Sequence, residues 1–78
     1  MDKNKIYQTQ SFDLAIVLSA LGYKLVFIDK TRPQFIFEFE NSDEIPSIVS
    51  AYYAGELKID PRIVLLHSKL VKNRMYGG

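Results

Sequence analysis

The segment SFDLAIVLSALG, residues 11–22, predicts the helix around which the rest of the chain folds. Ser11 is a typical N-cap residue, and Asp13 falls in the first turn, where the helix dipole favours a carboxylate. Apolar residues follow at helical spacing, at Leu14, Val17, Leu18 and Leu21. Gly22 is a typical residue for the position that follows the end of a helix. Because this helix is apolar over most of its circumference, we expect it to be the most buried one.

Two β-rich runs, residues 23–29 and 34–40, follow this helix and are separated by KTRP, which predicts a β-hairpin. In the second run the alternating residues are Phe35, Phe37 and Phe39 on one face and Glu38 and Glu40 on the other. We expect the phenylalanine face to pack on the first helix.

The first of these two runs is apolar on both faces. A period of two would place Leu25 and Phe27 on one face and Val26 and Ile28 on the opposite face. A strand with two apolar faces is expected to lie inside a sheet rather than at its edge.

The remaining segments complete the predicted order. Residues 6–9 favour a short first strand, and Ser42 is expected to cap a second helix with two acids in its first turn and Gly55 at its end. The apolar face of that helix would comprise Ile45, Ile48, Val49 and Tyr52. Residues 56–59 form an extended connection or a further strand. Asp60 and a proline begin the last helix, which runs from residue 62 to about 76.

The whole pattern predicts one small α+β domain over residues 1–78, in the order β-α-β-β-α-(β)-α, with an antiparallel or mixed sheet and helices on one face. Residues 6–76 are expected to fold, with residues 1–5 and 77–78 frayed. The chain has no cysteine, which excludes disulfides and thiolate metal sites. Its longest apolar stretch, between Asp13 and Asp29, is interrupted by Lys24 and is too short to cross a membrane. We therefore expect a cytoplasmic protein with no membrane partner.

The inventory of catalytic groups is small. The single histidine, His67, projects beside Ile63, Leu66 and Leu70, which we expect to form the buried face of the last helix. We interpret His67 as a boundary residue that hydrogen-bonds one ring nitrogen, because no second metal ligand or orienting carboxylate lies one turn away. The serines, at positions 11, 19, 42, 47, 50 and 68, have no evident base.

Four acids lie close together in the sequence: Glu38, Glu40, Asp43 and Glu44. They are explained by the solvated face of a sheet followed by a helix N-terminus, and the alternative is a divalent-cation site. No glycine-rich nucleotide motif occurs. The expectation is a protein that is not an enzyme, with no catalytic residues, no metal, no cofactor and no small-molecule substrate.

Charge is distributed unevenly along the chain. Residues 38–60 carry six acids and one base, whereas residues 61–78 carry four bases and no acid. On the last helix the residues that project together are Arg62, Lys69, Lys72, Asn73 and Tyr76, opposite the expected apolar face. This stripe either contacts the phosphates of a nucleic acid or is only the solvated side of a helix whose cations favour its C-terminus. Arg74 is expected to extend from the apolar side into solvent.

A third interpretation is protein association. The acidic middle segment and the basic last helix could meet across a symmetric dimer or bind different partners. Tyr52 and Tyr53 support contact with a protein, because adjacent helix residues cannot both face one core and tyrosine is common at interfaces.

The chain contains several short motifs that can be compared with known families. They are Tyr7-x-Thr9, Leu14-Ala15 through Leu18-x-Ala20-Leu21-Gly22-Tyr23, Phe35-x-Phe37-x-Phe39-Glu40, Tyr52-Tyr53-x-Gly55-Glu56-Leu57-Lys58-Ile59-Asp60-Pro61 and Leu70-x-Lys72-x-x-Met75-Tyr76. Together they resemble a family of small domains of unknown function seen in phages and other bacterial mobile elements. The resemblance spans residues 6–76 and implies a phage or mobile-element context. It brings no established activity, so no catalytic residues are carried over from it. The leading hypothesis is a nucleic-acid-associated accessory protein; the alternative is a protein-interaction module that engages a host protein or forms a homodimer.

Overall fold

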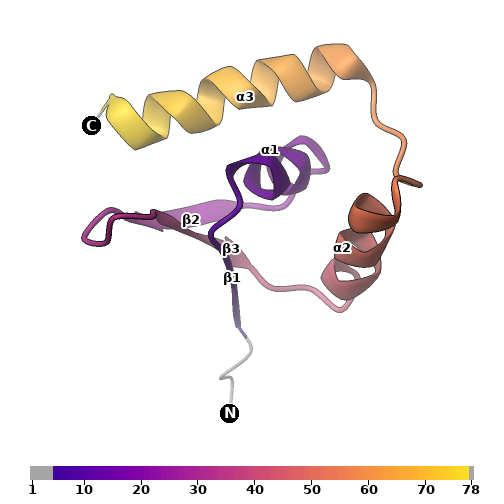
Figure 1. Ribbon diagram of the computed structural model, residues 1–78, viewed down its shortest axis with the longest axis horizontal. Helices are drawn as coiled ribbons and strands as arrows, with labels where there is room; N and C mark the ends of the chain where they lie inside the picture. Colours follow the sequence, from indigo (N-terminus) through magenta and orange to yellow (C-terminus); the bar gives the residue numbers. More distant parts are fainter. Residues whose placement is uncertain (1–4, 78) are drawn as a thin grey trace.

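The computed structural model describes residues 5–77, which form three strands and three helices (Figure 1). In chain order they are β1 (Ile6–Thr9), α1 (Phe12–Ala20), β2 (Leu25–Asp29), β3 (Ile36–Glu40), α2 (Ile45–Ala54) and α3 (Pro61–Tyr76). This confirms the predicted α+β class and order, and no strand lies between α2 and α3. The fraying predicted at residues 1–4 and 78 lies outside the described residues. Lys5 and Gly77 each take part in a backbone hydrogen bond.

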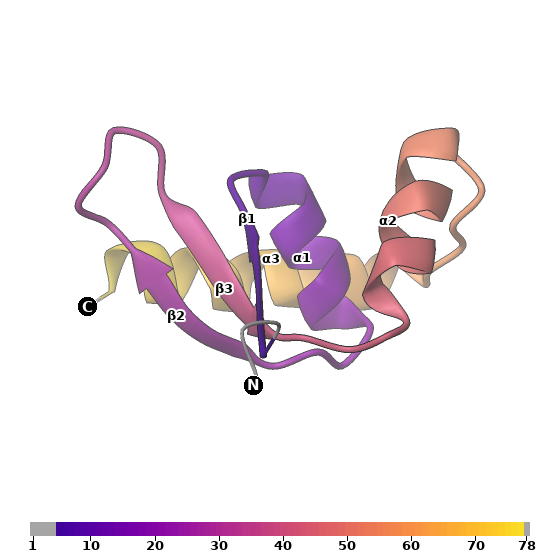
Figure 2. The same ribbon diagram turned by 90° about the horizontal axis from the view of Figure 1, so that it is seen from below.

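The sheet is antiparallel, with β3 in the centre and β1 and β2 at its edges (Figure 2). β2 and β3 pair as the predicted hairpin. The expectation that β2 lies inside the sheet is wrong, because β1 pairs with the free edge of β3 instead. An irregularity in β2 decides which of its apolar side chains face the core.

A β-bulge in β2 changes which side chains face the core. Leu25 lies opposite Phe39, but the next paired residue of β2 is Phe27, opposite Glu38. Val26 is the extra residue, so the alternation shifts by one position along the strand. The expectation that Leu25 and Phe27 share a face is therefore wrong: Leu25 is buried, whereas Phe27 is 55% exposed on the outer face of the sheet.

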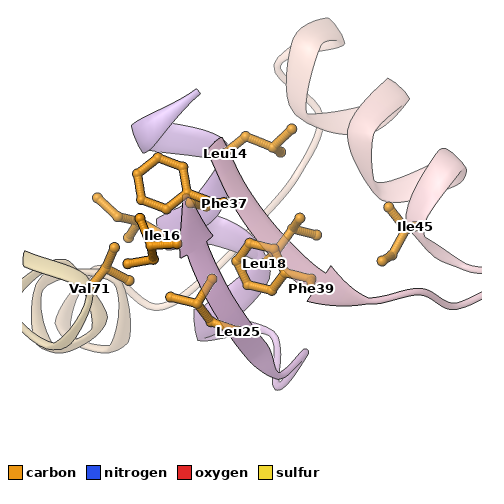
Figure 3. Close-up of a cluster of buried hydrophobic side chains, with 10 residues drawn as sticks. Leu14, Ile16, Leu18, Leu25, Phe37, Phe39, Ile45 and Val71 are labelled. Carbon is orange, nitrogen blue, oxygen red and sulfur yellow. The ribbon is translucent and has the colours of Figure 1, made fainter. Parts of the chain in front are cut away.

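The protein has three layers, in which α1 lies between the sheet and α3 (Figures 1 and 2). The phenylalanine face of β3 packs on α1 as predicted. Figure 3 shows the resulting cluster, whose members include Leu14, Leu18, Leu25, Phe37, Phe39, Ile45 and Val71. The buried residues of α1 run without a gap from position 14 to position 18, which confirms it as the most buried helix. Within residues 5–77, α3 lies beyond α1 and α2 lies to one side, so no helix covers the opposite face of the sheet (Figure 1).

Most of the predicted helix ends are confirmed. The Ser11 hydroxyl accepts the amide of Leu14 at 3.1 Å, and Gly55 ends α2 with a φ of +73°. The Asp60 carboxylate accepts the amide of Arg62 at 2.9 Å at the start of α3. The cap of α2 differs from the prediction, because Ser42 accepts the amide of Glu44 in a turn that precedes the helix. Pro46 stands in the first turn, where an amide has no intrahelical partner.

Candidate binding surface on the C-terminal helix

The face of α3 that packs against α1 is not the predicted one. The inner side of the helix is formed by Val64, Val71 and Met75, of which Val71 is only 1% exposed. Ile63, Leu66 and Leu70, which the sequence predicted to be buried, are exposed instead. Both sets follow helical spacing, so the projection alone could not choose between them.

His67 shows how the inner face is satisfied. Its Nδ1 lies 2.7 Å from the Oγ of Ser19 on α1, in a partly buried hydrogen bond. This confirms a boundary histidine with one ring nitrogen hydrogen-bonded. It also corrects the expectation that no serine has a nearby base, because Ser19 is 48 residues away in the sequence. A serine–histidine catalytic arrangement further requires a group that orients the ring and donors for an oxyanion. The groove beside this pair has no carboxylate in its lining.

All five residues predicted to bind nucleic acid lie together on α3 and are exposed: Arg62, Lys69, Lys72, Asn73 and Tyr76. Two of their charges have partners within the protein. The guanidinium of Arg62 forms two hydrogen bonds with the Asp60 carboxylate, at 3.2 and 2.9 Å, which lower the pKa of Asp60. The ammonium of Lys72 lies 6.0 Å from the centre of the Phe12 ring, at the range of a cation–π contact.

Large apolar side chains share the outward side of α3 with these cations. Leu65 is 64% exposed and Leu66 is 51% exposed, and Ile63 and Leu70 are exposed as well. We call the exposed set, which consists of Arg62, Ile63, Leu65, Leu66, Lys69, Leu70, Lys72, Asn73 and Tyr76, the α3 outer surface. Figure 1 shows α1 along the opposite, inner side of this helix, and α1 is the element with which α3 makes its main contact among residues 5–77. Sequence analysis missed the apolar part of this surface because it assigned three of these residues to the core.

A groove of about 470 Å³ runs beside α3, where the helix passes the end of α1 and the start of β2. Its lining consists of Ser19, Lys24, Leu25, His67, Leu70, Val71, Asn73 and Arg74. The guanidinium of Arg74 donates to the carbonyl oxygen of Leu25 at 2.6 Å. Arg74 was expected to extend into solvent, and the residue is exposed; the structure adds that its guanidinium is also anchored to the bulged strand.

Two of the four acids considered as a cation site, Glu38 and Glu44, accept hydrogen bonds from other side chains. Glu38 accepts a hydrogen bond from the side-chain amide of Gln8 at 2.8 Å across the outer face of the sheet. Glu44 accepts one from the hydroxyl of Tyr23 at 2.7 Å, and this bond raises the pKa of Tyr23. Among residues 5–77, no three His, Asp or Glu side chains converge as metal ligands would.

Tyr52 and Tyr53 divide as the sequence predicted. Tyr52 is partly buried against the core, whereas Tyr53 is exposed, and their rings meet edge to face at 5.0 Å between centres.

No helix within residues 5–77 has the length and apolar character that spanning a membrane requires.

Comparison with known proteins places the chain by its family. No match was found among curated proteins or among solved structures. Residues 4–77 match the family described as "Domain of unknown function (DUF5659)". This match covers nearly the whole length and the helix ends, core positions and α3 surface described above. The chain therefore belongs to the DUF5659 family of domains of unknown function.

Proposed function

We propose that this protein is a non-catalytic interaction module that binds a partner protein through the α3 outer surface. One observation carries the proposal: four large aliphatic side chains are exposed on the helix that also carries four bases and no acid. Several large aliphatic side chains exposed on one helix of a small domain mark a contact surface more often than a solvated one. A surface that bound only phosphate would have no use for Leu65 and Leu66.

The charges of this surface indicate the chemistry of the partner. Segment 61–78 contributes four positive charges and no negative one. An amphipathic helix with an apolar stripe and acidic flanks would complement it in both respects. A second copy of α3 would not, because two such helices packed together would place like charges opposite one another. The proposed partner is therefore an acidic amphipathic segment of another protein.

Selection from a displayed library of random peptides about 15 residues long tests this proposal, since helices begin to be stable at that length. Peptides retained by the immobilised protein should be acidic, with apolar residues spaced as on one helix face. Leu66→Gln should weaken the binding of a selected peptide about tenfold, as loss of a contact worth more than 1 kcal/mol does.

Tyr53→Gln is the matched control, because Tyr53 is an exposed apolar residue on α2 and not on α3. It should leave binding unchanged. Enrichment of neutral or basic peptides, or equal losses from the two variants, would refute the proposal.

Nucleic-acid binding is the second candidate, and the exposed Lys69, Lys72 and Tyr76 favour it. These residues offer two cations and one ring to a phosphate backbone and its bases. The discriminating measurement is fluorescence anisotropy of labelled single- and double-stranded DNA and RNA at low and moderate salt. Binding that falls steeply with salt and is lost in Lys69→Gln/Lys72→Gln would favour nucleic acid. No binding at low salt would eliminate it.

The cellular context is part of the same proposal. The sequence resemblance described above supports a phage or mobile-element origin and, with it, action in the cytoplasm of a host. A host protein is then the expected source of the acidic segment.

A further inference from the structure

The groove beside α3 combines an apolar floor with a positively charged rim. Leu25 and Val71 are buried and form its floor, and the half-exposed Leu70 forms a wall. The polar lining consists of Ser19, Lys24, His67, Asn73 and Arg74, with two cations and no acid. Its volume of about 470 Å³ falls in the range of small-molecule sites.

Arg74 is held in place by the fold. Its Nη1 donates to the carbonyl oxygen of Leu25, at the residue where the β-bulge begins. A guanidinium has five N–H donors in a planar fork, so one such bond fixes its position and leaves others for a ligand. That fork matches the geometry of a carboxylate, and an arginine positioned in advance loses less entropy on binding.

His67 is oriented in a similar way. Its Nδ1 is engaged by Ser19, which fixes the plane of the ring at the wall of the groove. Lys24 lies at the start of β2 and adds a second positive charge without a fixed direction. The polar lining therefore adds two cations and an oriented imidazole to the buried apolar residues Leu25 and Val71.

We propose that this groove binds a small carboxylate with a short apolar chain. The apolar chain would lie on Leu25, Leu70 and Val71, and the carboxylate would pair with Arg74 and Lys24. A cation is disfavoured because the lining has no acid, and free phosphate would gain nothing from the apolar floor. The proposal is independent of the interaction module, since only Leu70 and Asn73 belong to both surfaces.

The test is an NMR titration of the ¹⁵N-labelled protein with octanoate, alongside octylammonium and 1-octanol. Octanoate should shift amides of residues around 19, 24–25, 67 and 70–74, while octylammonium should bind far more weakly and 1-octanol should fall between them. Arg74→Gln should raise the dissociation constant of octanoate about tenfold, which corresponds to about 1.4 kcal/mol of binding free energy. Lys24→Gln provides a second variant that leaves the bond to Leu25 intact.

Lys72→Gln is the matched control, because it removes one charge from the same helix outside the groove lining. It should leave octanoate binding nearly unchanged. Equal binding of octylammonium, shifts spread over the α3 outer surface, or unchanged affinity in both Arg74→Gln and Lys24→Gln would overturn the proposal. A tripeptide ending in leucine that bound tenfold more tightly than octanoate would also overturn it, in favour of a protein C-terminus.

Discussion

Phe37 and Phe27 provide a matched pair of phenylalanines on neighbouring strands. Phe37 is 1% exposed and packs against α1, whereas Phe27 is 55% exposed on the outer face of the sheet. Replacing each by alanine removes the same atoms from two different environments. The comparison therefore tests both the facing of β3 and the bulge in β2.

The expected magnitudes follow from burial. Removing a fully buried phenylalanine side chain costs about 3–5 kcal/mol, the sum of lost transfer free energy and a cavity. At Phe27 slightly less than half of the side chain is buried and no cavity forms, so the cost should be about 1 kcal/mol. A chain of 78 residues typically has a stability of about 4–12 kcal/mol, so Phe37→Ala removes a large part of it.

Urea denaturation followed by circular dichroism measures both changes. With a denaturant slope of about 1 kcal/mol/M, the midpoint should fall by about 3 M or more in Phe37→Ala and by about 1 M in Phe27→Ala. If Phe37→Ala does not fold, Phe37→Leu should show a smaller loss that is still measurable. Equal losses at the two positions would mean that the bulge does not turn Phe27 outward.

Three further predictions concern the helices. Val71→Ala should lower the free energy of unfolding by about 2 kcal/mol, because it removes two methyl groups and leaves a cavity, whereas Leu66→Ala should lower it by less than about 1 kcal/mol. A larger loss in Leu66→Ala, measured by urea denaturation, would mean that the face predicted from the sequence is the buried one. Gly55→Ala should lower the free energy of unfolding by about 1 kcal/mol in the same assay. The φ of Gly55 is +73° and the added Cβ would meet no atom within 4 Å, so backbone strain is the only cost. A gain in stability would contradict this prediction. Hydrogen bonds from Arg62 lower the pKa of Asp60 below 3.8 in the folded state. The ionised Asp60 therefore stabilises the fold fully at pH values above the pKa of Asp60 in the unfolded chain, and this stabilisation is lost as pH falls through the lowered pKa of the folded state. Asp60→Asn keeps the cap and should flatten the loss of stability below pH 3.8, and an unchanged acid limb would exclude this contribution.

Local signals in the sequence predicted the elements well. Ser11 marks the start of α1 and Gly22 follows its end, Gly55 ends α2, and Asp60 begins α3. These ends can be predicted because each residue satisfies backbone groups within a few positions of itself. The alternating phenylalanines of β3 also faced the core as expected. These features depend on neighbours along the chain and not on the tertiary fold.

The errors arose where distant segments decide the outcome. The bulge at Val26 depends on how β2 pairs with β3, and β2 contains no proline or glycine from which a bulge could be predicted. The rotation of α3 depends on α1, since the bond between His67 and Ser19 joins residues 48 apart. Arg74 likewise finds its acceptor 49 residues away, on β2. The apolar residues of α3 are spread around the helix, so the sequence alone left two faces that could be buried.

The strand order has a consequence for how the chain assembles. β3 pairs with β2 through a local hairpin, whereas its pairing with β1 joins Ile6 to Glu40 and encloses the whole of α1. During synthesis β1 and α1 are made first, and the central strand that β1 requires is complete only at residue 40. The most apolar helix therefore leaves the ribosome with no sheet to cover it, and its other side stays uncovered until α3 follows. At about 5–20 residues per second, the 20 residues from the end of α1 to the end of β3 take about 1–4 s, and in that time the apolar surface of α1 is open to aggregation and to chaperones.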